Sequence, residues 1–302
     1  MSQPLIFDIK RYAINDGPGI RLAIYFKGCS LRCVWCHNPE SIAPQAQKLY
    51  TAARCIGCGE CVKVCPVHAL ELTDEGICTD SARCTLCGAC ARVCPTRAME
   101  ISGEEKSIAE LMTMIEREQH LFDQSDGGVT VSGGEPLLYP DYLFELFDRC
   151  GERRIHRALD TAGHVPEKTL LAAVRHTDLF LFDLKLIDGK RHQQLTGVDN
   201  QLILSNLRAL AASGAQIQIR IPLIKGVNTS DADLEEFAGV IAGLPGEKKN
   251  VALLPYHAIA THKYRKLGTS YQTEELQSPE QADLDRALDC FIRHELNASV
   301  GG

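Results

Sequence analysis

Three cysteines stand close together near the N-terminus, in the stretch GCSLRCVWCHNPE at residues 28–40. Their spacing is CxxxCxxC, and no fourth cysteine follows within this loop. Thiolates bind zinc and iron–sulfur clusters, and a four-iron cluster held by protein alone takes four cysteines. If Cys29, Cys33 and Cys36 hold such a cluster, one iron stays open to a ligand that is not protein. The spacing therefore predicts a cluster that takes part in chemistry.

Two further segments repeat one cysteine pattern. RCIGCGECVKVCPVHAL at 54–70 and RCTLCGACARVCPTRAM at 83–99 share CxxCGxCxxVCPxxA. This is the spacing of bacterial ferredoxins, in which the fourth cysteine ligates the neighbouring cluster. Zinc modules usually place two ligands close together and two far along the chain, so a pair of zinc sites explains the repeat less well. We expect two accessory [4Fe-4S] clusters, one on Cys55, Cys58, Cys61 and Cys94, the other on Cys84, Cys87, Cys90 and Cys65.

The remaining cysteines do not fit these patterns. Twelve of the fourteen cysteines lie between Cys29 and Cys94, and Cys78 among them matches no ligand position. Cys150 and Cys290 fall in predicted helices, and we interpret all three as ordinary thiols. In a chain of 302 residues this cysteine usage favours metal binding over a disulfide framework.

Composition and charge limit the partners. The formal charge of -7 argues against a broad nucleic-acid surface. The longest apolar runs, such as LFLFDLKLI, are strand-sized and interrupted by charge, and MSQPLIFDIK lacks the apolar stretch of a signal peptide. We therefore expect a cytoplasmic protein that binds neither nucleic acid nor membrane.

Outside residues 48–105, strand-like and helix-like segments alternate. Candidate helices cover 107–121, where Ser107 and Glu110 form a capping box, 141–150, and 165–176, with Pro166 near the first turn. Candidate strands are 22–27, 129–132, 155–160, 179–185, 216–223 and 251–255. Six βα units predict an α/β fold, a partial (β/α)6 barrel of residues 1–47 and 106–302, with 48–105 inserted as a ferredoxin-like domain.

Polar residues lie at or just after the carboxyl ends of the predicted strands. Taken singly, a terminal Asp can cap a helix and a GG pair can simply turn the chain. The carboxyl ends of parallel strands meet at one rim, however, and active sites form there. Besides the cysteine loop, the residues at this rim are Gly133, Gly134, Glu135, Asp160, Thr161, Asp183, Lys185, Arg220 and His257.

Several motifs together carry a family resemblance. CSLRCVWC at 29–36 with VSGGEP at 131–136 resembles the radical S-adenosylmethionine superfamily. Six further segments resemble motifs of the glycyl-radical enzyme activating enzymes, typified by pyruvate formate-lyase activase. They are NDGPGIR at 15–21, CHN at 36–38, DTAG at 160–163, DLK at 183–185, TGVDNQLILSNL at 196–207 and LPYH at 254–257. The resemblance spans about residues 14–265, and the twin cysteine runs resemble those of the longer activases.

The resemblance implies a reaction. S-adenosylmethionine would chelate the open iron, take one electron from the reduced cluster and split into methionine and a 5'-deoxyadenosyl radical. That radical would abstract hydrogen from a backbone glycine of a partner glycyl-radical enzyme. Flavodoxin or ferredoxin would supply the electron, and oxygen sensitivity implies an anaerobic cytosol.

The resemblance also implies residue roles. Cys29, Cys33 and Cys36 would bind the catalytic cluster, and Trp35 would pack near the adenine. The cofactor's methionine amino group would meet Gly133, Gly134 and Glu135, and its carboxylate, with a small monovalent cation, would meet Asp160, Thr161 and Asp183. Lys185 and His257 match contacts to ribose or carboxylate, Arg220 fits a further polar contact, and Asp16 and His37 would face the incoming peptide.

Alternatives remain open at this point. The radical chemistry could act on a small molecule or on anaerobic ribonucleotide reductase, or the chain could be an electron-transfer ferredoxin fused to a structural barrel. The accessory clusters could relay electrons, or they could stabilise the insert or dock the partner. Partner specificity is expected in surface loops and in the segment from about residue 266 onward. The sequence does not identify the partner enzyme or the oligomeric state.

Overall fold

A computed structural model describes residues 3–247, 249–269 and 276–301 of the chain, so part of the segment predicted to set specificity, residues 270–275 and 302, lies outside the described residues. A nine-stranded sheet forms its centre, in the order β13-β12-β11-β10-β9-β8-β2-β1-β7. Strands β2 and β8 to β13 run parallel, and β1 and β7 pair antiparallel at one edge. The bounds are β1 (Leu5–Ala13), β2 (Arg21–Phe26), β7 (Glu104–Glu105), β8 (Gly128–Gly133), β9 (His156–Thr161), β10 (Leu179–Asp183), β11 (Ile217–Leu223), β12 (Asn250–Pro255) and β13 (Asn297–Val300).

The sheet confirms the predicted parallel order. The six predicted strands are β2 and β8 to β12, each within two residues at either end. Strands β1, β7 and β13 were not predicted. They lie at the two edges of the sheet and are largely half-buried or exposed, so they lack the continuous apolar run of the central strands. The fold is the expected partial barrel, open between its two edges.

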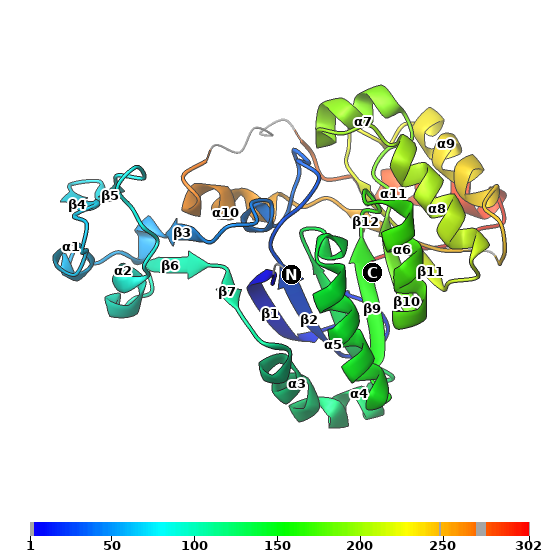
Figure 1. The fold of residues 1–302 in the computed structure, drawn as a ribbon. Helices are drawn as coiled ribbons and strands as arrows, with labels where there is room; N and C mark the ends of the chain where they lie inside the picture. Colours follow the sequence, from blue (N-terminus) through cyan, green and yellow to red (C-terminus); the bar gives the residue numbers. More distant parts are fainter. Residues whose placement is uncertain (1–2, 248, 270–275, 302) are drawn as a thin grey trace.

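Helices cover the outer face of the sheet (Figure 1). The Ser107–Glu110 capping box is present. The predicted helix at 107–121 is in fact two helices, because the chain breaks at Glu118, whose buried carboxylate pairs with Arg11 of β1. The bounds are α3 (Ile108–Arg117), α4 (Gln119–Ser125), α5 (Pro140–Glu152), α6 (Glu167–Ala173), α7 (Gly189–Thr196), α8 (Gln201–Ala212), α9 (Asp231–Ala242), α10 (Thr261–Lys266) and α11 (Gln281–Arg293).

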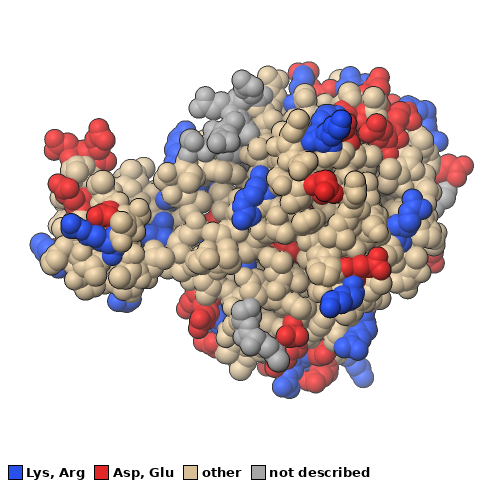
Figure 2. Space-filling view, turned by 45° about the horizontal axis from the view of Figure 1, so that its top comes forward, with Lys and Arg blue, Asp and Glu red and all other residues tan. Residues whose placement is uncertain are grey.

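The main core lies between the sheet and these helices. Phe147, Phe182 and Phe237 are fully buried there, with aliphatic residues of β8 to β12. Each such side chain contributes about 1.5–3 kcal/mol of burial free energy. Within the described residues, no helix has both the length and the apolar character needed to cross a membrane. Figure 2 shows acidic and basic side chains interspersed on one face, with no extended basic area.

The segment from β3 to β6 projects away from the barrel (Figure 1). Strand β3 (Gln47–Tyr50) pairs with β6 (Met99–Ser102), and β4 (Leu70–Thr73) pairs with β5 (Gly76–Thr79). Helices α1 (Glu60–Lys63) and α2 (Ala89–Val93) each carry part of one cysteine run. The pairing of β3 with β6 begins at Gln47, one residue before the expected start of the insert. The domain boundaries at 48 and 105 stay a prediction.

One buried lysine ties the base of this segment to the barrel. Lys27 follows β2, and its ammonium group donates to Gln47 Oε1 at 2.9 Å and to the main-chain oxygen of Glu40. Burial lowers the pKa of Lys27 to about 8. A Cβ atom at Gly103 would lie 2.6 Å from Lys27 Cδ, so glycine lets the returning chain pass close to the lysine. The insert is therefore fixed where both of its ends meet the barrel.

Candidate functional site

A cavity of ≈ 200 Å³ opens at the carboxyl ends of the parallel strands. This is where the alternation of strands and helices predicted a site. The structure brings most of the expected residues to its wall, from β8 to β11 and from the loop after β2. These residues are Cys29, Cys33, Trp35, Cys36, His37, Gly133, Gly134, Asp160, Thr161, Asp183, Lys185 and Arg220.

The cysteine loop is held in place by main-chain hydrogen bonds. Arg32 N donates to Thr196 O at 2.7 Å and Val34 N donates to Leu195 O at 2.9 Å, which fixes the loop against the end of α7. Burial, with a smaller contribution from neighbouring thiols, raises the pKa of Cys29 and of Cys36 to about 12. Burial and the neighbouring thiols disfavour deprotonation of each cysteine when no metal is bound. The positive charge of a bound metal has the opposite effect and favours the thiolate form. The three thiols thus fit a metal cluster.

Two carboxylates and two cations lie beside the thiols. Lys185 Nζ lies 3.0 Å from Asp183 Oδ2, and Arg220 Nε lies 3.2 Å from Asp183 Oδ1. Arg220 Nη1 lies 3.6 Å from Asp160 Oδ2. Asp183 is the last residue of β10 and Arg220 lies on the neighbouring β11, with the two residues in register. Parallel pairing of strands distant in sequence therefore builds this network.

The network is not fully satisfied by protein atoms. Asp183 Oδ1, Arg220 Nε and Arg220 Nη1 are buried and meet other groups of the described structure only as ion pairs, without a hydrogen bond of suitable geometry. Buried polar groups are costly unless they are hydrogen-bonded. A ligand with carboxylate and amino groups would satisfy them, as would a small cation beside the carboxylates. These atoms therefore fit a zwitterionic cofactor next to the thiols.

Burial and the neighbouring charges together determine the pKa values of Asp160 and Asp183. Burial raises the pKa of Asp160 to about 6, although the nearby Arg220 guanidinium works in the opposite direction. Burial also acts to raise the pKa of Asp183, but Lys185 and Arg220 outweigh it and hold that pKa below its ordinary value. Asp183 therefore stays ionised to lower pH than Asp160, set between two cations.

The glycine pair brings β8 against the end of β2. Gly133 has φ +114°, and a Cβ at Gly134 would lie 2.0 Å from the main-chain oxygen of Gly28. The main-chain N–H groups of Gly134 and Glu135 donate to Phe26 O at 2.9 Å and to Gly28 O at 2.7 Å. Only glycine permits this approach. The pair consequently fixes the distance between the cysteine loop and β8.

Glu135 lies behind the cavity wall. Its carboxylate accepts from Thr161 Oγ1 at 2.8 Å and from Ala162 N at 3.0 Å, and it is fully buried. Burial raises the pKa of Glu135 to about 7. The structure therefore joins Glu135 to Thr161, which does line the cavity, and its expected contact with an amino group stays a prediction.

The remaining expected residues take different positions. Trp35 is 5% exposed and packs with Leu186 and Tyr256, while the His37 ring lies 5.7 Å from that of Tyr256. Asp16 accepts from Tyr25 Oη at 2.9 Å and lies near enough to Arg220 to raise its pKa, but it does not line the cavity. His257 is exposed and also lies outside the lining. Their predicted contacts stay predictions.

Sequence reasoning did not single out several residues that shape the site. Ser132 donates to Asp160 Oδ2 at 2.5 Å, and Asn206 Nδ2 donates to Gly163 O and Val165 O, each at 2.7 Å. Arg21 is fully buried and holds the loop before β2 by donating from Nη1 to Pro18 O at 3.0 Å, while its Nε donates to Thr130 Oγ1 of β8. All three stand inside the motifs VSGGEP, TGVDNQLILSNL and NDGPGIR, which is the signal that could have identified them.

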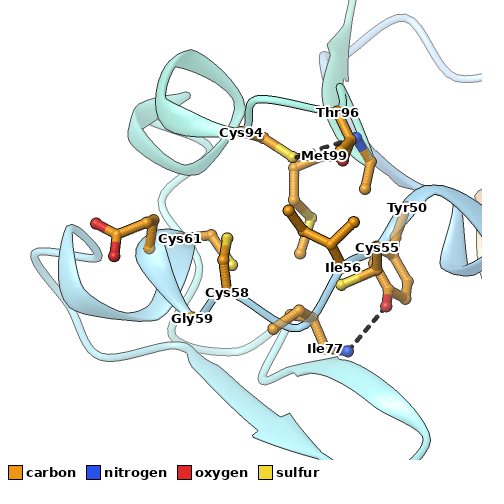
Figure 3. A pocket seen from close by; sticks show the side chains of 12 residues that line it. Tyr50, Cys55, Ile56, Cys58, Gly59, Cys61, Ile77, Cys94, Thr96 and Met99 are labelled. Carbon is orange, nitrogen blue, oxygen red and sulfur yellow. Dashed lines mark hydrogen bonds between the residues drawn. The ribbon is translucent and has the colours of Figure 1, made fainter.

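The insert contains two further cavities lined by cysteines. One is lined by Cys55, Cys58, Cys61 and Cys94, and Figure 3 shows these side chains around one space. The other is lined by Cys65, Cys84, Cys87 and Cys90. Each cavity thus draws three cysteines from one run and the fourth from the other run. This is the exchange that the ferredoxin spacing predicts.

The two cysteine cavities differ in the residue that β3 contributes. Tyr50 lies at the first cavity, where its hydroxyl is within hydrogen-bonding range of the Cys55 thiol and accepts from Ile77 N at 3.0 Å (Figure 3). Lys48, two residues earlier on the same strand, lies at the second cavity, where burial lowers its pKa and the nearby Cys84 and Cys90 act in the opposite direction. One site therefore has a neutral neighbour and the other a cation.

Comparisons with known proteins agree with this arrangement. A family model for 4Fe-4S dicluster domains matches residues 54–105, and one for 4Fe-4S single cluster domains matches residues 15–62. The chain is 43% identical over 300 residues to the trans-4-hydroxy-L-proline dehydratase activating enzyme of Clostridioides difficile, covering 99% of both chains. It is 40% identical over 302 residues to the choline trimethylamine-lyase activating enzyme of Oleidesulfovibrio alaskensis, covering 98% of this chain and 97% of the relative.

A solved structure is similar over part of the chain. It is a domain of a pyruvate-formate lyase-activating enzyme from Bacteroides vulgatus, 36% identical, with a TM-score of 0.51. The match covers 58% of this chain and 99% of the solved chain.

Proposed function

The chain belongs to the activating enzymes of glycyl-radical enzymes, and from this we propose that it cleaves S-adenosylmethionine reductively at the Cys29–Cys33–Cys36 site and abstracts hydrogen from a backbone glycine of a partner enzyme. One observation carries the proposal. Three thiols, two carboxylates and two cations converge on one cavity at the carboxyl ends of the strands, and some of their buried polar atoms still lack a hydrogen bond of suitable geometry. A plain ferredoxin would need neither a site with only three thiols nor the buried charged groups beside it.

The residues divide into those that hold the cluster and those that hold the cofactor. Cys29, Cys33 and Cys36 supply three ligands of a [4Fe-4S] cluster. When bound, this cluster and S-adenosylmethionine supply the one-electron reductive cleavage that yields the hydrogen-abstracting radical. Asp183 with Lys185 and Arg220 is a charge-balanced group against which a zwitterion and a small cation can be oriented. Trp35 adds an apolar wall.

The insert holds two more [4Fe-4S] clusters, giving three in all. Support comes from the two cavities, each with four cysteines drawn from both runs. Cys58 and Cys87 are exposed, which places one ligand of each set at the protein surface. Surface ligands favour electron entry from a soluble donor such as flavodoxin or ferredoxin. We favour this relay over a purely structural insert because Lys48 and Tyr50 give the two sites different electrostatics, and charge and hydrogen bonds set cluster potentials.

The partner approaches the open side of the cavity. His37 follows the third thiol ligand and lines the cavity, while Asp16 precedes β2 and lies near Arg220 of the cavity wall. Lys263 of α10 bonds Asn38 Oδ1 at 2.7 Å, and Tyr264 bonds Cys36 O at 3.1 Å, which links the segment after β12 to the cysteine loop. Contacts of a partner with α10 would therefore reach the cluster loop directly.

The decisive test uses anaerobic, cluster-loaded protein. We expect dithionite-reduced enzyme to convert S-adenosylmethionine into 5'-deoxyadenosine, and to generate a glycine-centred doublet in the electron paramagnetic resonance spectrum of its partner. Candidate partners begin with glycyl-radical enzymes of the two kinds named in the relatives, a trans-4-hydroxy-L-proline dehydratase and a choline trimethylamine-lyase.

The matched variants are Cys33→Ala and Cys78→Ala. Cys33 lines the catalytic cavity, while Cys78 is exposed on β5 outside both cysteine sets. Cys33→Ala should abolish 5'-deoxyadenosine formation and leave the iron of the insert in place, whereas Cys78→Ala should behave as wild type. Undiminished cleavage by Cys33→Ala would remove the assignment.

A further inference from the structure

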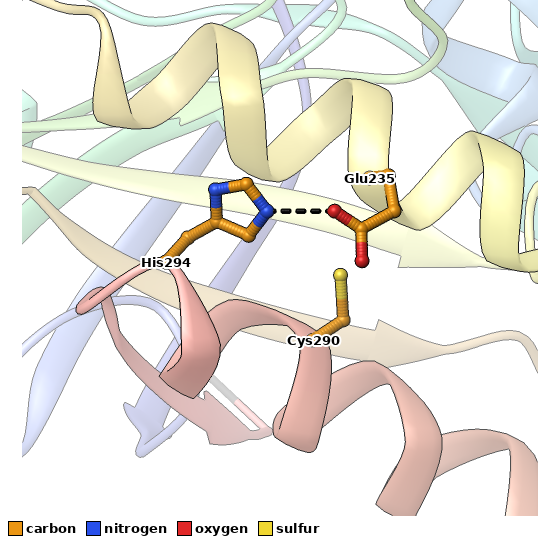
Figure 4. A group of neighbouring side chains, drawn as sticks. All are labelled: Glu235, Cys290 and His294. Atoms are coloured by element: carbon orange, nitrogen blue, oxygen red, sulfur yellow. Dashed lines mark hydrogen bonds and ion pairs between the residues drawn. The ribbon is translucent and has the colours of Figure 1, made fainter.

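Helices α9 and α11 bring three metal-binding side chains together on the outside of the barrel. Glu235 lies on α9, Cys290 lies on α11, and His294 follows α11 directly. Figure 4 shows the Cys290 sulfur and the His294 ring both turned toward the Glu235 carboxylate. One potential ligand atom from each residue lies within 4.8 Å of the other two. None of these residues has a part in the proposed radical chemistry.

Helix geometry explains the grouping. Cys290 and His294 are four residues apart, which places them on the same face about one turn from each other. Glu235 on the packed helix α9 faces the gap between them, and its Oε2 lies 2.7 Å from His294 Nε2. The thiol is also within hydrogen-bonding range of the same carboxylate. The three groups are thus held by two rigid helices and by one another.

Burial and access suit a bound ion. Cys290 is 2% exposed, while Glu235 and His294 retain 48% and 29% of their side-chain exposure. Glu235 and Cys290 also line a surface cavity of ≈ 190 Å³, whose charged lining contains two further acids and two arginines, Asp231, Asp289, Arg286 and Arg293. A single water needs about 10–15 Å³, so the cavity has room for an ion and a water ligand. An ion can therefore enter from solvent and still find a shielded sulfur.

The donor set selects the metal. One thiolate, one imidazole and one carboxylate are the ligands that Zn²⁺ takes in tetrahedral sites, and three protein ligands leave the fourth position to water. Mg²⁺ and Ca²⁺ prefer all-oxygen sites and would not use the sulfur. Arg293 donates to Glu235 Oε1 at 2.7 Å, so the other oxygen, Oε2, is the one available to an ion.

We propose that Glu235, Cys290 and His294 form a zinc site that joins α11 to α9. Binding forms one bond each to sulfur, nitrogen and oxygen, and releases the Cys290 thiol proton to solvent. His294 binds through neutral Nε2, with its ring proton on Nδ1. The Arg293 contact to Glu235 Oε1 stays in place and orients the carboxylate. The sequence-based interpretation of Cys290 as an ordinary thiol is replaced by a ligand role.

The test is made on the full chain, loaded anaerobically with iron and sulfide so that the cluster cysteines are occupied. The protein is exchanged against one equivalent of Zn²⁺, and zinc and iron are counted by mass spectrometry. We expect about one zinc per chain with unchanged iron, and a zinc X-ray absorption spectrum with one sulfur at about 2.3 Å and the remaining ligands at about 2.0–2.1 Å. Zinc that shows several sulfur ligands would instead lie in an unfilled cluster site and would overturn the assignment.

Substitutions distinguish a zinc site from an ion pair that only joins the two helices. His294→Gln and Glu235→Gln alter half-exposed side chains and should fold, and each should weaken zinc binding at least tenfold. Cys290→Ala should remove the sulfur from the absorption spectrum. The matched control is Cys150→Ala, a change at another buried helical cysteine, which contacts Met112 and should keep the zinc. Zinc content unchanged in His294→Gln and Cys290→Ala would refute the site, as would wild-type protein that takes up no zinc.

Discussion

Replacing Lys48 by methionine removes the positive charge beside one accessory cluster site and keeps the length and apolar stem of the side chain. Lys48 lies at the cavity of Cys65, Cys84, Cys87 and Cys90, while Tyr50 occupies the equivalent place at the other cavity. Reduction makes a cluster more negative, so a nearby cation stabilises the reduced form. We therefore expect Lys48→Met to lower the potential of this one cluster.

The size of the effect follows from Coulomb's law. Two unit charges 4 Å apart interact by about 4 kcal/mol at an effective dielectric constant of 20, and by about half that at twice the separation. Since 59 mV corresponds to a tenfold change for a one-electron couple, about 2 kcal/mol is about 90 mV. Lys48 is only half-buried, so solvent screening reduces the expected shift to about 30–60 mV.

The assay is a potentiometric titration of the reduced protein, followed by electron paramagnetic resonance at low temperature. Cys87→Ser and Cys58→Ser assign the two accessory signals, because each alters one cysteine set. Tyr50→Phe is the reciprocal variant, since it removes a hydroxyl near Cys55 and should shift the other cluster. If Lys48→Met left both accessory potentials unchanged, or shifted only the cluster at Cys58, the electrostatic reasoning would be refuted.

Three further predictions concern the relay, the buried acid and the loop before β2. Cys58→Ala should slow activation by flavodoxin or ferredoxin more than cleavage driven by dithionite, and equal losses in the two assays would favour a structural insert. The folded-state pKa of Glu135 is raised to about 7, so its protonated form favours folding below its ordinary pKa and this contribution is lost as pH rises toward 7. As pH rises from about 4.5 to 7, the free energy of unfolding of Glu135→Gln should therefore increase by up to about 3 kcal/mol relative to that of wild type. This would be measured anaerobically as a difference in Tm that changes with pH. A difference in Tm that stays constant over this range would contradict the burial argument. Gly19→Ala should lower the free energy of unfolding by at least about 2 kcal/mol, because Gly19 has φ +66° and its Cβ would lie 2.2 Å from Ser125 O. The control Gly226→Ala has φ +80° with open space around it, and should lower the free energy of unfolding by only about 1 kcal/mol of backbone strain. Equal losses of Tm in the two variants would count against the close contact.

Much of the fold was predictable because the signals are short-range. Strands β2 and β8 are buried on both faces and β11 is fully buried on one face, and both patterns can be recognised in the sequence. Edge strands β1 and β13 escaped prediction because pairing partners, rather than composition, hold them in the sheet. The break at Glu118 was missed for a similar reason, since it coincides with an ion pair between the buried Glu118 carboxylate and Arg11 from another part of the chain.

The sequence by itself determined the cysteine spacings, the order of the strands and hence which polar residues end on the same rim. These depend on distances of a few residues along the chain and on the common direction of parallel strands. Only the tertiary structure decided that Arg220 lies between Asp160 and Asp183, and that Glu135 faces Thr161. It also decided that α9 and α11 bring Glu235 to Cys290 and His294. Side-chain direction and burial arise from packing between distant segments, and that packing fixes which charges meet and which polar atoms remain for a ligand.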